Sequence, residues 1–292
     1  MRVIVPFAPG GPNDVLARLI AQKLSERHGK QFFIENIAGA SSNIGTGQAA
    51  KAGSDGYTIL ITSDAFAINP AFFDKVPYEP FKDFQPVTLA VSFSHVLAIN
   101  PSVQASTMKE LVALIKASSG KYNFASPGTG TAPHLVGEQL RQSLGLDLVH
   151  IPFNGGGPAV ASVVAGHTPI YIGSPIPAVP QIKDGKLRAL AVTGKMRAQA
   201  LPDVLTMAES GLPDIEVRSW IGVLAPMGTP KDIITLLNSD IAKIIELTDV
   251  KERLASIGFE AIGSTPEDFA TQIKIEFEKW GRVIRAGNIK PE

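Results

Sequence analysis

Short runs of Val, Ile and Leu alternate along the chain with segments in which hydrophobic residues recur at helical spacing. This alternation is typical of α/β proteins, in which helices cover both faces of a mostly parallel sheet. In the first half the pattern predicts strands at 2–6, 31–36 and 58–63 and helices at 13–28 and 44–52. Residues 69–87 are rich in aromatic residues and proline, which predicts an irregular segment on the surface.

The second half of the chain repeats the alternation. Its predicted helices are 106–118, 131–144, 157–165, 176–184, 230–246 and 266–287, and its predicted strands are 122–126, 147–153, 168–173 and 187–193. Apolar stretches at 95–103 and 217–226 are the candidate crossings between two halves. We therefore expect a discontinuous first lobe, 1–98 plus 222–292, a second lobe, 99–221, and hinge crossings near 95–101 and 217–225.

One turn occurs twice in the sequence. In VIVPFAPGGPND, from Val3 to Asp14, and in LVHIPFNGGGPAV, from Leu148 to Val160, a hydrophobic strand enters a glycine-rich loop that opens a helix with a proline. The first turn of a helix has N–H groups without intrahelical partners at the positive end of its dipole. Each turn thus offers a site for an anion, and Asn13 is placed to cap the first helix.

Three other loops carry candidate polar contacts. The loop FASPGTGTAPHL contains Thr129 and Thr131, which could cap the following helix or donate to a ligand. Ser63 and Asp64 stand at the carboxyl end of a predicted strand, where ligands of open α/β sheets lie. The segment AGASSNIGTG, residues 38–47, could close part of the same site. A purely structural role remains open for each loop and for Asp14.

Composition narrows the classes of function. Lys plus Arg and Asp plus Glu are 27 each, so no overall charge attracts nucleic acid or an anionic membrane. The absence of cysteine excludes thiol nucleophiles and thiolate metal sites. The five histidines are scattered, and no zinc helix, serine elbow or nucleotide-binding glycine motif is present. We expect no metal and no cofactor, although a triad of distant Ser, His and Asp stays open.

Several blocks in this order resemble the tripartite tricarboxylate transporter substrate-binding proteins, also called the Bug family. They are VPFAPGGPND, SNIGTGQAAKAGSDGYTIL, GTGTAPHL, HIPFNGGGPAVASVVAG, IKDGKLRALAVTG and SWIGVLAPMGTP, which extend over nearly the whole chain. The resemblance implies a type II periplasmic binding protein fold, with two α/β lobes around a ligand cleft. It also implies a monomeric solute-binding protein that delivers an organic acid to a permease of one small and one large membrane subunit.

In this family a carboxylate is usually bound by backbone amides, hydroxyls and water without a salt bridge. Transferred to this chain, the family site and the loops above predict the following ligand-binding residues: Phe7, Pro9, Gly10, Gly11, Asn13, Ser42, Asn43, Ser63, Asp64, Thr129, Thr131, Asn154, Gly155, Gly156, Gly157, Pro158, Ala159 and Ser174. We expect a periplasmic protein, and the sequence as given shows no signal peptide at Met1.

The sequence departs from the family pattern in two places. IGSPIPAVP, with Ser174 and three prolines, stands where an aromatic and an acidic residue are common, so analogy does not assign how the distal end of the ligand is held. Ser41 to Asn43 replace the usual glycines, which favours a ligand with a polar group or a second carboxylate. The alternatives are an α/β hydrolase-like or other enzyme acting on a small carboxylate, and a ligand-sensing partner protein.

Overall fold

The computed structural model describes residues 1–118, 120–287 and 289–290. The chain divides into two compact units. Unit 1 contains Met1–Ser92, Trp220–Ala255 and Phe259–Glu292, and unit 2 contains Phe93–Ser219 and Ser256–Gly258. Each unit has its own sheet and its own hydrophobic core.

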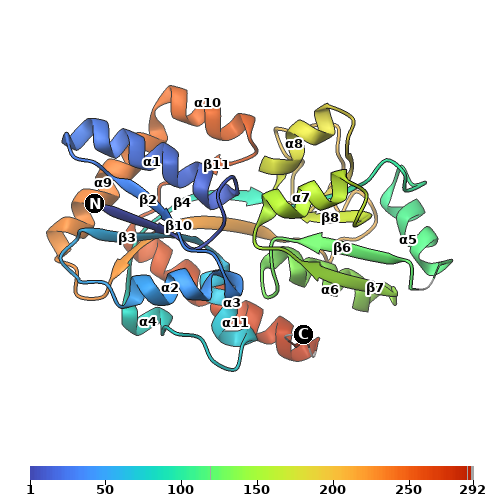
Figure 1. Ribbon diagram of the computed structural model, residues 1–292, viewed down its shortest axis with the longest axis horizontal. Helices are drawn as coiled ribbons and strands as arrows, with labels where there is room; N and C mark the ends of the chain where they lie inside the picture. The colour runs from blue at the N-terminus through green and yellow to red at the C-terminus, as the bar shows by residue number, and fades with distance from the viewer. Residues whose placement is uncertain (119, 288, 291–292) are drawn as a thin grey trace. The chain divides into compact units, whose positions relative to one another are not determined.

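Unit 1 is built on a six-stranded sheet with the order β11-β4-β10-β3-β1-β2 (Figure 1). Its strands are β1 (Arg2–Val5), β2 (Phe33–Asn36), β3 (Thr58–Ser63), β4 (Phe84–Ser94), β10 (Arg218–Pro226) and β11 (Glu260–Ala261). β1 pairs in parallel with both β2 and β3, whereas β10 is antiparallel to β3 and β11 is antiparallel to β4. The parallel part of the sheet is therefore formed by its three N-terminal strands, β1, β2 and β3.

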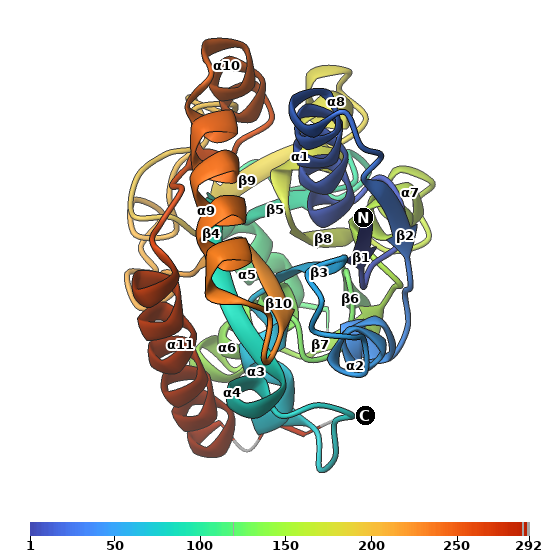
Figure 2. The same ribbon diagram turned by 90° about the vertical axis from the view of Figure 1, so that its left-hand side faces the viewer.

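Helices lie on both faces of this sheet. They are α1 (Pro12–His28), the 3₁₀ turn η1 (Ala40–Ser42), α2 (Asn43–Ala50), α3 (Ala65–Phe72), α4 (Pro80–Asp83), α9 (Lys231–Glu246), α10 (Thr248–Ser256) and α11 (Pro266–Ala286). Figures 1 and 2 show α1 and α9 on one face and α2, α3 and α11 on the other. Trp220, Phe66 and Phe269 are among the large side chains buried between the sheet and the second group of helices.

Unit 2 is built on a five-stranded sheet with the order β7-β6-β8-β5-β9. Its elements are β5 (Val96–Ile99), α5 (Met108–Lys116), β6 (Tyr122–Ser126), α6 (Ala132–Leu144), β7 (Leu148–Pro152), α7 (Gly156–Val164), β8 (Ile170–Gly173), α8 (Pro175–Lys183) and β9 (Arg188–Val192). β6 is parallel to β7 and β8, and β5 is antiparallel to β8 and β9.

Alternate residues of the unit 2 strands face opposite layers, as the period of two of a strand requires. Val96, Ala98 and Tyr171 pack in one cluster with residues of α7 and α8. Leu97, Ile170 and Ile172 instead line a small cavity with residues of α5 and α6. Both faces of this sheet are thus hydrophobic at its centre, which explains why β5 and β8 read as continuous apolar runs in the sequence.

The prediction of an irregular surface segment at 69–87 is wrong. The chain there forms the end of α3, then α4 and the start of β4. The rings of Phe66 and Tyr78 are stacked at 5.4 Å, and Phe84 meets Phe66 edge to face at 5.3 Å. All three side chains are buried, so this aromatic stretch contributes to the core of unit 1. Pro80 stands in the first turn of α4, which helices tolerate, whereas Pro70 lies inside α3 and Pro86 inside β4.

The other main differences concern the edges and crossings of the predicted lobes. Val96–Ile99, which the sequence suggested as a crossing, is a strand inside the unit 2 sheet. The division between the units falls between Ser92 and Phe93 and again between Ser219 and Trp220. The overall class, a mixed α/β protein of two sheets covered by helices, is the one predicted.

Candidate functional site

The residues predicted to bind ligand lie in each unit at the carboxyl ends of three mutually parallel strands. In unit 1 these are β1, β2 and β3, and in unit 2 they are β6, β7 and β8. The carboxyl ends of parallel strands meet at one edge of a sheet, so the loops that follow them gather there. Every predicted site residue lies at such a strand end or in the loop or first helical turn that follows it.

The loop after β1 has a frame of polar side chains. Gly10, with φ +82°, donates its N–H to Asp14 Oδ2 at 3.0 Å, and Arg18 Nε donates to the same oxygen at 2.9 Å. Asn36, at the end of β2, donates from Nδ2 to Asp14 Oδ1 at 3.0 Å and to the Phe7 carbonyl at 3.1 Å. The frame fixes the loop, and it occupies the Gly10 N–H that the sequence had offered to a ligand.

Asp14 is a structural carboxylate in this frame. Burial raises the pKa of Asp14, but the hydrogen bonds from Arg18, the Gly10 N–H and Asn36 outweigh burial and hold the pKa below its usual value. Its charge is thereby compensated inside the loop. Asn13 does not cap α1, because α1 begins one residue earlier with Gly11 as its N-cap. The Asn13 Oδ1 atom is buried and has no hydrogen-bond partner.

The loop after β2 ends in an unusual turn. Ala40, Ser41 and Ser42 all have positive φ, at 45°, 53° and 79°, in a region that residues with a Cβ seldom adopt. Asn69 of α3 holds this turn, since its Nδ2 lies 2.6 Å from the Ser41 carbonyl and 2.9 Å from Asn43 Oδ1. Such strain persists only where its surroundings enforce it, and it is concentrated at functional sites.

The remaining predicted residues of unit 1 are at the end of β3. Ser63 is the last residue of the strand and Asp64 precedes α3. Both are buried, and the Asp64 carbonyl accepts from the N–H groups of Ala67 and Ile68. Their position at the strand end agrees with the expectation, and their contact with a ligand stays a prediction.

In unit 2 the loop after β6 is held by its own side chains. Thr131 is the N-cap residue of α6, but its hydroxyl donates to the Gly128 carbonyl at 2.7 Å and does not cap the helix. Gly128 and Gly130 have positive φ, at 149° and 78°. Thr129 is half-buried between them.

The loop after β7 opens α7 with glycines. Gly155 is the N-cap residue, with φ +129°, a conformation that requires glycine, and α7 begins at Gly156. A Cβ on Gly157 would have no atom within 4 Å, whereas a Cβ on Gly156 would lie 3.3 Å from Pro177 and 3.4 Å from the Tyr171 hydroxyl. In the first turn of α7, Gly156 is therefore packed against Pro177 and Tyr171, whereas Gly157 has free space beside its Cα.

The loop after β8 is shaped by Tyr171 and Ser174. The buried Tyr171 hydroxyl donates to the Ser174 carbonyl at 2.9 Å, and burial raises the pKa of Tyr171. The Ser174 hydroxyl accepts from the Ile176 N–H at 3.3 Å and so caps α8. Tyr171 passes beneath Gly173, where any Cβ would collide with its ring. Ser174 thus has a capping role that the sequence did not predict.

A serine and a histidine lie side by side near the end of β6. Ser126 Oγ and His150 Nε2 are 2.7 Å apart, the separation of a nucleophile and its base. Ser126 has no exposed surface, however, and the buried His150 Nδ1 has no hydrogen-bond partner that would orient the ring. Burial lowers the pKa of His150 to about 3. This pair is therefore buried structure and is not arranged as a catalytic triad.

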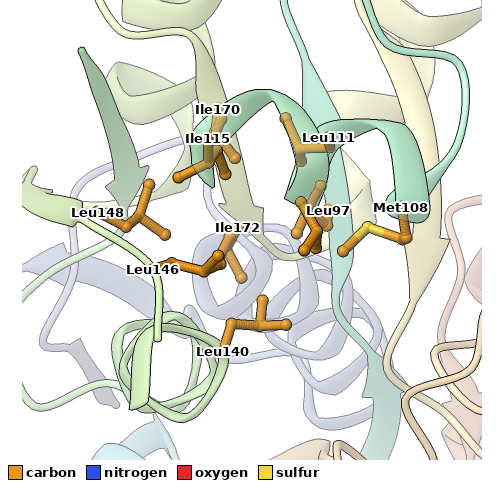
Figure 3. Close-up of a pocket in the computed structure, with 10 residues that line it drawn as sticks. Leu97, Met108, Leu111, Ile115, Leu140, Leu146, Leu148, Ile170 and Ile172 are labelled. Carbon is orange, nitrogen blue, oxygen red and sulfur yellow. The ribbon is translucent and has the colours of Figure 1, made fainter. Parts of the chain in front are cut away.

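Other features of the described residues do not suggest a binding site for an acid. The cavity between α5, α6 and the sheet of unit 2 is lined only by hydrophobic side chains, as Figure 3 shows. Within the described ranges, no three His, Asp or Glu residues are grouped as a metal site would require. None of the described helices combines the length and hydrophobicity needed to cross a membrane.

Sequence reasoning missed the side chains that support the loops. They are Arg18, Asn36, Asn69, Ser126, His134 and His150. Asn36 and Ser126 are the last residues of their strands, and this position is a signal that a reading of the sequence could have used. The pairing of Asn69 with a turn 26 to 28 residues earlier has no such local signal.

Comparisons with known proteins identify the family and the fold. Residues 16–289 match the family model described as tripartite tricarboxylate transporter family receptor. The chain is 34% identical to Protein BugT of Bordetella pertussis over 292 residues, which is 99% of this chain and 90% of BugT.

Two solved structures carry acids in their descriptions. The structure of R. palustris Rpa4515 with adipate is 31% identical, with a TM-score of 0.97 and coverage of 100% of this chain and 98% of that one. MatC from Rhodopseudomonas palustris with bound malate is 30% identical, with a TM-score of 0.92 and coverage of 97% and 98%. The family consists of periplasmic solute-binding proteins and is not a family of enzymes. The chain therefore belongs to the tripartite tricarboxylate transporter family receptors, as a substrate-binding protein of the Bug type.

Proposed function

We propose that this protein captures a small mono- or dicarboxylic acid in the periplasm and delivers it to the small and large permease subunits of a tripartite transporter. The observation that supports this most directly is the placement of the glycine-rich helix starts. In each unit one of them follows a strand of the parallel set, after β1 in unit 1 and after β7 in unit 2. Related proteins with adipate and with malate support the choice of a carboxylate ligand.

Both units contribute donors to the bound acid in this proposal. The first turns of α1 and α7 supply backbone N–H groups at the positive ends of helix dipoles. Ser42, Asn43 and Ser63 in unit 1, and Thr129, Thr131 and Ser174 in unit 2, add hydroxyl and amide groups or hold the loops. Arg18 is already paired with Asp14, so neutral groups replace the hydration of the carboxylate.

Hydrogen bonds from neutral groups can supply enough free energy for micromolar binding of an acid. A hydrogen bond to a charged oxygen contributes about 1.5 to 3 kcal/mol net. A dissociation constant of 1 μM corresponds to about 8 kcal/mol. Three to five such bonds, reduced by the cost of ordering the ligand and the loops, account for micromolar binding without a salt bridge.

Introducing a negative charge at Gly157 tests the proposal. Gly157→Asp places a carboxylate at the first turn of α7 without a collision, because the space beyond its Cα is open. We expect the variant to lose at least 100-fold in affinity, since a negative charge repels the ligand where N–H groups should receive it. Isothermal titration calorimetry with a panel of C3 to C6 mono- and dicarboxylic acids, including malate and adipate, measures the effect.

Gly157→Ala is the matched control, because it adds the same Cβ without the charge. It should keep the affinity within about threefold, a difference of less than 1 kcal/mol. If no acid of the panel binds the unmodified protein, the proposed function is wrong. If Gly157→Asp binds an acid as tightly as Gly157→Ala does, the proposed place of the carboxylate is wrong. Uptake of the bound acid by vesicles that contain the two permease subunits, only when this protein is added, tests delivery.

A further inference from the structure

Two buried histidines lie directly beneath the loop between β6 and α6. His134 is in the first turn of α6 and His150 is in the middle of β7. The centres of their rings are 4.1 Å apart and the rings are inclined by 30°, and the centre of the Phe124 ring lies 4.9 Å from that of His150. Phe124 and His150 are direct partners in the parallel pairing of β6 and β7, which places His150 beside Phe124, while His134 approaches from α6.

Each histidine is tied to the loop by a hydrogen bond. The Gly130 N–H donates to His134 Nδ1 at 3.1 Å. His150 Nε2 lies 2.7 Å from Ser126 Oγ, and the Gly128 N–H donates to the same serine oxygen at 3.2 Å. The two glycines with positive φ in this loop are thus held from below, one directly by His134 and one through Ser126.

The contact with the Gly130 N–H requires a neutral His134. A nitrogen that accepts from the Gly130 N–H carries no proton, so His134 is the tautomer with its proton on Nε2. The charged groups near the pair are Glu138 and Arg141 of α6, which form an ion pair with each other at 2.7 Å. Burial lowers the pKa of His134 to about 4 and that of His150 to about 3.

We propose that His134, and His150 acting through Ser126, are positioning residues that hold the β6–α6 loop in the conformation that receives the bound acid. The inference rests on the proposed function, because it assumes that the Thr129 region contacts the ligand. In this role the histidines shape the loop from beneath and do not touch the ligand themselves. Protonation of His134 removes its acceptor and releases Gly130, so the acid is held less tightly at low pH.

Two substitutions of His134 separate this role from simple packing. His134→Phe keeps a ring against His150 but removes the acceptor for Gly130, and His134→Asn keeps an acceptor oxygen near the position of Nδ1. We expect His134→Phe to weaken binding of the tightest acid of the panel about tenfold, which corresponds to about 1.4 kcal/mol. His134→Asn should recover most of this loss. Calorimetry at pH 7.5 gives both values.

Leu140→Ala is the control for a loss of stability alone. Leu140 is on the same helix, α6, but lines the hydrophobic cavity of Figure 3, away from the loop. This variant should lower the melting temperature and leave the affinity unchanged. If it weakens binding as much as His134→Phe does, the histidine acts only through stability and the inference is wrong.

The dependence of affinity on pH is a second readout. As the pH falls to 4, where a pKa of about 4 leaves His134 half protonated, the unmodified protein should lose about twofold more affinity for the acid than His134→Asn does, because asparagine does not titrate. Parallel profiles, or equal affinity of the unmodified protein and His134→Phe, would overturn the inference while leaving the proposed function intact. Absence of binding by the unmodified protein would instead overturn the proposed function.

Discussion

Buried polar side chains of this protein act mainly on loops. Asp14, Asn69 and His134 each accept from or donate to the backbone of a loop that follows a parallel strand. A donor or acceptor left unpaired in the interior costs about 1 to 3 kcal/mol, so each of these contacts favours one loop conformation over others. At the scale of single residues, the loops of the candidate site are therefore held in place by buried side chains that we do not expect to contact the ligand.

Three of the five histidines are buried and neutral, and this predicts sensitivity to acid. Burial lowers the pKa values of His95 and His150 to about 3 and that of His134 to about 4, against 6.5 for an exposed histidine. The unfolded chain binds protons on them below pH 6.5 and the folded chain does not. Their contribution to stability is complete above about pH 6.5 and is lost as the pH falls toward 4.

The free energy of unfolding should fall by about 1.4 kcal/mol per pH unit for each histidine that remains neutral. Urea unfolding at pH 7.5, 6.5, 5.5 and 4.5 measures the trend. Glu276 acts in the opposite direction, because burial raises the pKa of its carboxyl, but it is one group against three. A midpoint that stays constant from pH 7.5 to 5 would contradict the neutral state of the histidines.

At the scale of elements, Gly137 of α6 and Gly281 of α11 are two helix glycines with different surroundings. A Cβ on Gly137 of α6 would lie 2.2 Å from the Phe124 ring, so α6 approaches β6 closely at this point. A Cβ on Gly281 of α11 would have the flexible end of Arg285 at 3.3 Å and Ala71 at 3.8 Å. Only the first glycine is required for packing.

Alanine at the two positions should therefore change stability with opposite signs. Replacing glycine by alanine inside a helix gains about 1 kcal/mol of intrinsic propensity. In Gly137→Ala this gain is outweighed by a collision that costs about 1 to 3 kcal/mol or more, because the Phe124 ring is enclosed. Gly281→Ala should be neutral or more stable by up to about 1 kcal/mol. Thermal unfolding of both variants decides the point, and a more stable Gly137→Ala would refute the close packing.

Elements that follow glycine-rich turns were predicted within two residues of their observed bounds. Gly-Pro pairs mark the start of α1 and α7 because glycine permits the turn and proline fits the first helical turn. β4 was not predicted, because Phe84 and Pro86 gave its start the composition of a loop. The support of the site by His134 and His150 also escaped prediction, since it depends on the register of β6 against β7.

At the scale of the whole molecule, the two units share the proposed task. If both contribute donors to one acid, binding should protect backbone amides in the loop after β1 and in the loop after β7 together. Hydrogen exchange followed by mass spectrometry, with and without saturating acid, measures both regions. Protection confined to one unit would contradict a shared ligand.

The same ligand should raise the melting temperature of the protein. At 100 times its dissociation constant, a ligand that binds only the folded state adds about 2.7 kcal/mol to stability. In a chain of this size that corresponds to several degrees. An acid of the panel that shows no binding in calorimetry serves as the control and should leave the melting temperature unchanged.

The strand order of unit 1 determines when, during synthesis of the chain, its sheet can be completed. β10 lies between β3 and β4, although more than 120 residues of unit 2 separate it from β4 in the chain. A polypeptide that emerges amino end first holds two unfinished sheet edges until residue 226 has appeared, whereas nearly all of unit 2 is already available by then. Open edges invite pairing with other chains. The unfinished sheet of unit 1 is therefore most exposed to such pairing before β10 has been made.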